Sequence, residues 1–149
     1  MDPFANEMEF IFHKEICGAR LKPVLKTIQL MKELGVVDIC SACADEKTGG
    51  CCHFGIETCY TNMLILMNLL GGVRIPEQRK LENNCLFVGE YGCQLNVRFK
   101  TCIHHLCPKI LNSLSEYDLF RLRATTSYEI KVGLQTESAI RDWISEIRS

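Results

Sequence analysis

The sequence predicts a mainly α-helical fold, a small single domain over residues 1–149 with two helical arms around a loop-rich centre. Three observations predict it. Apolar residues recur at helical spacing in residues 1–39 and again in residues 113–149. Nine of the ten cysteines lie between these arms, in a segment of short, irregular stretches over residues 40–110. A chain of 149 residues is long enough to bury one core.

The first arm, residues 1–39, is predicted to hold two helices. Asp2 caps the first one, and Pro3 occupies the first turn, where proline is favoured. Its apolar residues at helical spacing are Phe4, Met8, Ile11, Phe12 and Ile16. The second helix ends at Gly35 and carries on one side Leu21, Val24, Leu25, Ile28, Met31 and Leu34.

The last arm, residues 113–149, is also predicted to hold two helices. Ser113 and Glu116 match a capping box, and Thr136 is expected to cap a second helix after a break at Gly133. The apolar stripe of the first helix is predicted to be core and comprises Leu114, Tyr117, Phe120, Ala124 and Tyr128. The buried edge of the second helix comprises Ile140, Trp143, Ile144 and Ile147.

The centre, residues 40–110, contains one predicted helix from about Thr58 to Leu70, closed by Gly71 and Gly72. The rest is short and irregular, and we expect its own apolar residues to hold it together only weakly.

Composition and charge exclude several classes of protein. The formal net charge is −1, from 17 basic and 18 acidic side chains, so the basic surface of a nucleic-acid binder is not expected. The first residues do not form a signal peptide, and the longest apolar run, residues 63–70, is too short to span a membrane. We therefore expect a cytoplasmic protein with no membrane partner.

The cysteines are the feature that the sequence must explain. Disulfides do not persist in a reducing compartment, where clustered thiols are more often metal ligands or catalytic groups. Cys40 and Cys43 form a C-x-x-C pair, a spacing that lets two sulfurs converge on one ion. Cys17 stands alone and is expected to pack as a small apolar residue. The candidate metal ligands are Cys40, Cys43, Cys51, Cys52, Cys59, Cys85, Cys93, Cys102 and Cys107.

Adjacent side chains in an extended segment point to opposite faces, so Cys51 and Cys52 are not expected to share one ordinary tetrahedral site. Either they face different ions, or one is a ligand and the other packs. The nearby imidazoles of His53, His104 and His105 are alternative nitrogen ligands, although four-cysteine sites are common. Cations close to the last cysteines, able to offset thiolate charge, are Arg98, Lys100 and Lys109.

A C-x-x-C pair also occurs in thiol redox proteins, where it opens a helix after a strand. Residues 35–39 are apolar enough to form that strand, which keeps the redox interpretation open. The seven further cysteines that follow Cys43 favour metal binding instead, because a redox pair needs only two.

The order of a C-x-x-C pair, a Cys-Cys pair, a helix, and then Cys85, Gly92-Cys93 and Cys102 resembles the YkgJ-like cysteine-cluster proteins, described as zinc- or iron-chelating domains. The resemblance covers about residues 40 to 110. It implies one ligand group of Cys40, Cys43, Cys51 and Cys52, and a second of Cys85, Cys93 and Cys102. Cys59 and Cys107 are additional to that pattern, and residues 44–50 form a longer insertion than is usual in the family.

The sequence thus predicts a metal-binding protein whose thiolates hold zinc or iron in a structural or metal-handling role. The alternative is an iron–sulfur protein for electron transfer or redox sensing, because thiolates suit both kinds of site. An enzyme is less favoured, since the sequence contains no H-E-x-x-H, P-loop or G-x-S-x-G motif. Glu46, Glu57 and Glu90 are the carboxylates that could act as a base near a metal. Metal ions are the only partners that the sequence indicates.

Overall fold

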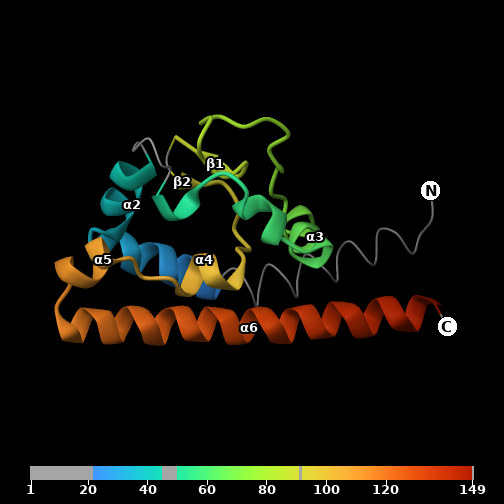
Figure 1. Cartoon of the computed structure of the whole chain (residues 1–149). Helices are drawn as coiled ribbons and strands as arrows, with labels where there is room; N and C mark the ends of the chain where they lie inside the picture. The colour runs from blue at the N-terminus through green and yellow to red at the C-terminus, as the bar shows by residue number, and fades with distance from the viewer. Residues whose placement is uncertain (1–21, 45–49, 91, 149) are drawn as a thin grey trace.

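The computed structural model describes residues 22–44, 50–90 and 92–148. It is mainly helical, as predicted. One long helix, α6 (Glu116–Arg148), forms the base of the molecule, and the other described elements lie on one side of it (Figure 1). The predicted first helix and Cys17 lie outside the described residues. Within the described ranges, no helix combines the length and apolarity needed to cross a membrane.

The elements above α6 are short. A helix covers residues 22–33, and it is followed by α2 (Val36–Ala44), α3 (Asn62–Leu70), α4 (Lys100–His104) and α5 (Pro108–Ser113). Two single 3₁₀ turns are η1 (Gly50–Cys52) and η2 (Ile56–Cys59). Strands β1 (Val88–Gly89) and β2 (Gly92–Cys93) pair antiparallel, with Val88 opposite Cys93. The centre is therefore loop-rich, as its sequence indicates.

Gly35 ends the helix of residues 22–33, as predicted. Its φ of 77° lies in the left-handed region that glycine adopts readily. The chain then re-enters a helix at once, so the strand expected over residues 35–39 is wrong and α2 stands in its place. The buried side of the preceding helix includes Val24 and Leu30, whereas Leu25 is exposed, which shifts the predicted stripe.

The last arm is one continuous helix, which corrects the predicted break at Gly133. Gly133 is buried inside α6, and a single glycine disfavours a helix by only roughly 1 kcal/mol, which does not interrupt this one. The cap is Ser115 rather than Ser113, because the Ser115 Oγ accepts the Asp118 N–H at 3.1 Å. Thr136 caps nothing, and its hydroxyl donates to the Val132 carbonyl within the helix at 2.8 Å.

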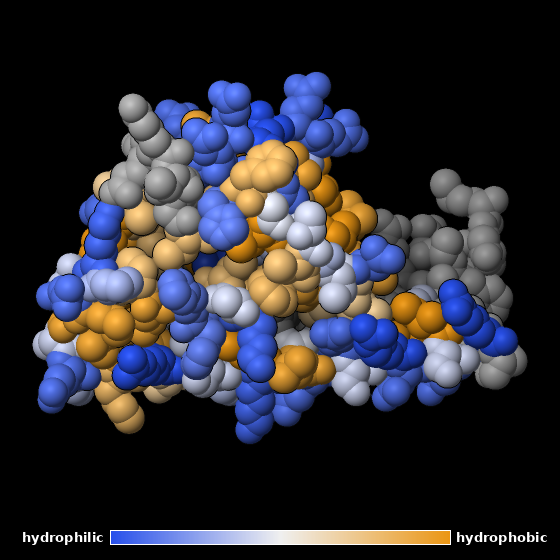
Figure 2. All heavy atoms as spheres, viewed as in Figure 1, coloured by the Kyte–Doolittle hydropathy of each residue, from blue (hydrophilic) through white to orange (hydrophobic). Residues whose placement is uncertain are grey.

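The predicted aromatic core of α6 is also wrong. Tyr117 and Phe120 are 70% and 71% exposed, and Tyr128 is exposed as well. Figure 2 shows hydrophobic side chains interspersed with charged ones along this helix. The buried stripe recurs at alternating intervals of three and four residues and includes Leu122, Thr126, Glu129, Gly133 and Ile140. Of the expected edge in the last part, Ile140 is buried, while Trp143 and Ile144 are partly buried.

Three apolar clusters hold the described elements together. The first joins the helix of residues 22–33, α2, α5 and α6 through Leu30, Val36, Cys107, Ile110 and Leu122. The second joins α3 to the later part of α6 through Met67, Val97 and Ile140. The third lies within the central loops and comprises Cys85, Phe87, Val88 and Leu95. The third cluster thus has four buried residues, one of them a cysteine, and eight partly buried side chains pack against it.

Asn68 fixes the segment before α4 to α3. This side chain is fully buried, and its Nδ2 donates to the carbonyls of Leu64 and Val97 at 2.9 and 2.8 Å. Its Oδ1 accepts the N–H groups of Asn96 and Val97 at 3.0 and 2.9 Å. One amide therefore satisfies backbone groups of a segment that has no regular secondary structure of its own.

We expect Asn68→Leu to destabilise the protein by about 3–5 kcal/mol, because it leaves several buried backbone groups unpaired at roughly 1–3 kcal/mol each. Chemical denaturation measures this loss. Asn62→Leu is the control, since Asn62 lies exposed in the same helix and should change stability by less than about 0.5 kcal/mol. Similar losses in the two variants would contradict the role given to Asn68.

Candidate metal centre

All nine candidate cysteines lie in the described part of the chain, and all are free thiols. They come from six places in the fold, which the rest of the chain brings to the same side of α6 (Figure 1). Those places are α2 (Cys40, Cys43), η1 (Cys51, Cys52), the end of η2 (Cys59), the loop before β1 (Cys85), β2 (Cys93), and the region of α4 and α5 (Cys102, Cys107).

Four of these thiols form what we call the first thiol group: Cys40, Cys43, Cys51 and Cys107. Cys40 and Cys43 are three residues apart on α2, so they lie on neighbouring positions of one face. Helix α2 contacts η1, which carries Cys51, and α5, which Cys107 caps, and it also contacts β2, which carries Cys93. Burial raises the pKa of Cys40, and the charges of Cys107, Cys51 and Cys43 raise it further.

Cys51 interacts with two of the same thiols, those of Cys107 and Cys43. Burial raises its pKa, followed by the charges of Cys107 and Cys43, and its thiol is hydrogen-bonded to that of Cys107. The ammonium of Lys109 lies 4.0 Å from the Cys43 sulfur. The first thiol group therefore joins residues that are more than 60 positions apart in sequence, with a lysine beside it.

Four of the remaining five thiols form the second thiol group: Cys52, Cys85, Cys93 and Cys102. The Cys85 N–H donates to the Cys52 carbonyl at 2.8 Å, and Cys52 packs against the third apolar cluster, which contains Cys85. Burial raises the pKa of Cys52 from 9.0 to about 12, with further contributions from the charges of Cys93, Cys102, Cys40 and Cys85, so the two groups adjoin. Burial likewise raises the pKa of Cys85 to about 11, and it raises those of Cys93 and Cys102.

Tyr60 lies beside the second thiol group, and the sequence analysis did not predict a role for it. Its hydroxyl is hydrogen-bonded to the thiols of Cys93 and Cys102, and in each case the bond lowers the pKa of the thiol. Its ring packs edge-on against Phe87, with the centroids 4.9 Å apart. Burial raises the pKa of Tyr60 itself, so its hydroxyl stays a neutral donor. The spacing of the cysteines contained no signal for this residue.

Arg98 lies within electrostatic range of both thiol groups. Its positive charge lowers the pKa of Cys40 in the first group and of Cys93 and Cys102 in the second. With Lys109 beside Cys43, two of the three cations expected to offset thiolate charge lie close to thiols. Lys100, the third, is exposed.

The charge interactions cross the division that the family resemblance implies, because Cys52 interacts with Cys93 and Cys102 as well as with Cys40, and Cys40 interacts with Cys107. Cys59 belongs to neither thiol group. It is exposed, and its charge raises the pKa of Cys102.

The described thiols are neighbours, not a finished coordination shell. Within residues 22–44, 50–90 and 92–148, no three His, Cys, Asp or Glu side chains form a ready metal-binding group. Four cysteines are nevertheless the donor set of a structural zinc site. A cysteine side chain has a single rotatable bond before its sulfur, and rotation about it moves the thiol between three staggered positions.

Comparison with known proteins found no match to this chain among protein-family models, curated proteins or solved structures. The grouping of the thiols therefore depends on the geometry of this chain alone.

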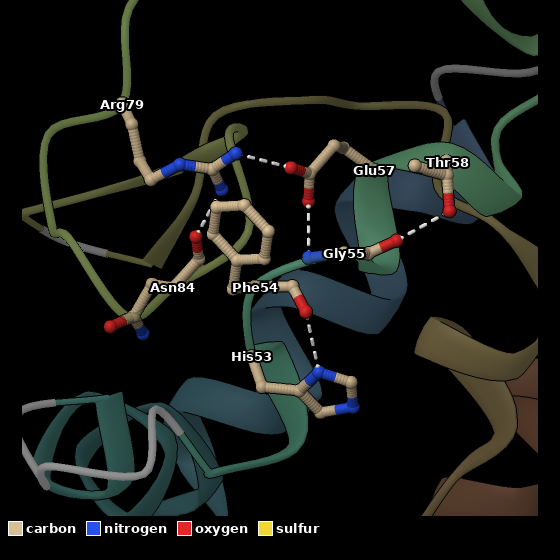
Figure 3. Close-up of polar contacts among 7 residues, drawn as sticks. All are labelled: His53, Phe54, Gly55, Glu57, Thr58, Arg79 and Asn84. Atoms are coloured by element: carbon tan, nitrogen blue, oxygen red, sulfur yellow. Dashed lines mark hydrogen bonds and ion pairs between the residues drawn. The ribbon is translucent and has the colours of Figure 1, made fainter.

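The histidines near the cysteines lie apart from this arrangement. His53, His104 and His105 are all exposed. The Nδ1 of His53 donates to the Phe54 carbonyl at 2.9 Å, as Figure 3 shows. In the part of the chain that the structure describes, no histidine is among the neighbours that shift a thiol pKa.

The carboxylate of Glu57 is engaged in the fold rather than open as a base. It accepts hydrogen bonds from the Arg79 guanidinium and from the Gly55 N–H, the latter at 3.0 Å (Figure 3). Burial acts to raise its pKa, but these bonds outweigh it and lower the pKa to about 2. Glu90 is exposed, and Glu46 lies outside the described residues.

Arg79 ties two loops together. Besides Glu57, it binds the Asn84 carbonyl and stacks over Phe54, 4.1 Å from the ring centroid. We expect Glu57→Gln to lower the free energy of unfolding at neutral pH by about 1–3 kcal/mol, because it leaves a partly buried guanidinium unpaired. The carboxylate pKa is depressed in the folded state, so this contribution is complete above about pH 4.5 and disappears as the pH falls towards about 2.

Denaturation of both proteins across this pH range measures the difference. Glu137→Gln is the control, because Glu137 pairs at 2.9 Å with the exposed Arg141 one helical turn away, a pair worth about 0.5 kcal/mol. A Glu57→Gln effect that did not shrink on acidification would contradict the assignment.

Proposed function

We propose that the protein binds metal ions through cysteine thiolates, and that zinc holds its central loops in place between the helical arms. The observation that carries this proposal is that the fold brings cysteines from distant segments together: α2, with Cys40 and Cys43, contacts η1, β2 and α5, and Cys52 packs against the apolar cluster that contains Cys85. The resemblance of residues 40–110 to YkgJ-like proteins points to the same class. Free thiols in this number also suit a reducing compartment such as the cytoplasm.

A structural role follows from what the ions would join. In the first thiol group, an ion would connect α2 to the start of α5; in the second, it would connect η1 to β2 and α4. Such cross-links replace the large apolar core that the centre lacks. A structural zinc ion contributes on the order of 10 kcal/mol or more to folding, which is comparable to the whole stability of an ordinary domain.

The position of Cys40 argues against a redox pair. A reactive C-x-x-C cysteine lies at a helix N-terminus, where the helix dipole lowers its pKa. Cys40 is instead the fifth residue of α2, and its pKa is raised. A thiol in this environment is a weak nucleophile until a metal ion displaces its proton.

Metal analysis combined with an anaerobic absorption spectrum tests the proposal. We expect colourless protein that contains zinc in whole-number proportion to the chain. A brown protein with broad absorbance near about 400 nm would instead identify an iron–sulfur cluster. Reduced, folded protein without either metal would overturn the proposed function.

A further inference from the structure

We propose that the exposed side of α6 binds a second copy of this chain, with the two α6 helices antiparallel about a two-fold axis. The surface is a stripe of five exposed residues, which we call the outer stripe: Tyr117, Phe120, Ala124, Tyr128 and Lys131. It lies away from the side of α6 that carries the thiols, so the dimer does not depend on metal binding. The first four residues belong to the apolar stripe that the sequence places in a core, and a dimer would bury them.

The outer stripe points away from the rest of the described molecule. At about 100° of rotation per helical residue, its five positions fall within an arc of about 80°. The buried residues Leu122, Thr126 and Gly133 lie on the opposite side of the same helix. The other described elements lie on that buried side as well (Figure 1). Two copies can therefore meet through the outer stripe with the other described elements of each chain on the outside.

The spacing of the outer stripe is symmetric about Ala124. Successive members are three, four, four and three residues apart. An antiparallel pair centred on Ala124 therefore places Phe120 beside the partner subunit's Tyr128, and symmetry repeats this contact. In the same way, Tyr117 lies beside the partner subunit's Lys131. Aromatic rings attract one another, an ammonium is attracted to the face of a ring, and the small Ala124 lets the helices approach closely at the centre.

Charge at the two ends of the outer stripe favours the antiparallel arrangement. The exposed Glu116 precedes Tyr117 at one end, and Lys131 is at the other. In the antiparallel pair, Glu116 lies near the partner subunit's Lys131, so opposite charges meet. A parallel pair would instead bring the two Glu116 carboxylates together and the two Lys131 ammonium groups together. The surface is therefore complementary to itself in the antiparallel orientation.

The exposed aromatic rings supply about half of the area of a standard dimer interface. Tyr117, Phe120 and Tyr128 are 70%, 71% and 54% exposed, so at about 200 Å² per aromatic side chain they offer roughly 400 Å². A standard interface buries about 800 Å² per partner. A groove of about 400 Å³ between α6 and the helix of residues 22–33 adjoins Phe120 and Ala124, and it offers further surface to a side chain of the second copy. We therefore expect a dimer of moderate affinity.

Analytical ultracentrifugation with a reductant present, which prevents disulfide-linked dimers, tests the proposal. We expect a reversible dimer at about 100 μM chain. Phe120→Glu should raise the dissociation constant by about 10³-fold, because the dimer loses two central aromatic side chains, each worth roughly 30-fold. Leu69→Glu is the matched control, because Leu69 is an apolar residue of α3 that is 54% exposed, and it should leave the constant unchanged. A monomer, whose outer stripe a different protein would have to cover, or equal weakening by the two variants would overturn the proposal.

Reversal of the end charges tests the orientation of the two copies. Glu116→Lys alone and Lys131→Glu alone each bring like charges together in the antiparallel pair, and each should raise the dissociation constant by about 10-fold. The double variant brings opposite charges together again and should return the constant to that of the unmodified protein. A double variant that dimerises as weakly as either single variant would overturn the antiparallel arrangement.

Discussion

Chelation of the bound zinc is expected to unfold the centre of the protein, residues 36–107. The ions would supply on the order of 10 kcal/mol each, and the apolar cluster within this segment has only four buried residues. Hydrogen exchange measured before and after chelation should show protection lost across α2, β1, β2 and α4. The single long helix α6 should keep part of its helicity by circular dichroism but lose its packing partners.

Readdition of zinc should restore the original exchange pattern, which separates metal loss from irreversible oxidation of the thiols. Magnesium is the control ion, because it prefers oxygen ligands and should restore nothing. Unchanged protection after complete zinc removal would contradict a structural role for the metal.

Zinc affinity is expected to rise steeply with pH. Every thiol of the second thiol group has a raised pKa, so each still holds its proton near neutral pH. Binding one ion through four thiolates then releases close to four protons, and the apparent association constant rises by up to about 10⁴ per pH unit. Competition with a chelator at about pH 6 and about pH 8 measures this slope.

Cys59→Ser is the control for the zinc measurement and should leave the slope unchanged. A slope near one proton per ion would mean that the four thiols do not act together.

The helical character of the chain could be read from its apolar spacing, but the boundaries could not. Residues 35–39 are short and apolar, and such a run fits a strand or a buried helix equally well. The structure resolves this in favour of α2, because Val36 packs against Leu30 and Leu122. The local sequence pattern of residues 35–39 does not show such tertiary contacts.

The last arm shows a second limit of sequence reasoning. The exposed stripe with Tyr117 and Phe120 is more apolar than the buried one, which contains Thr126, Glu129 and Gly133. A prediction that places the most apolar stripe in the core therefore selects the wrong face. Small residues and a close approach to the neighbouring elements decide the packing instead.

For the candidate site, the sequence pointed to the cysteines and predicted that Cys51 and Cys52 do not share one ordinary tetrahedral site, and both statements stay predictions. It could not assign Cys107 to the group of Cys40, because that contact depends on how α5 packs against α2. Tyr60 was missed for the same reason, since a hydroxyl near two thiols leaves no mark in the cysteine spacing. Contacts between residues that are far apart in sequence can be assigned only when the fold is known.

X-ray absorption at the zinc edge identifies the atoms that surround the metal in the purified protein. We expect zinc surrounded by about four sulfur atoms at about 2.3 Å, with no nitrogen or oxygen bound to it. A first shell of nitrogen and oxygen atoms, or correctly folded reduced protein that contains no zinc to measure, would contradict it.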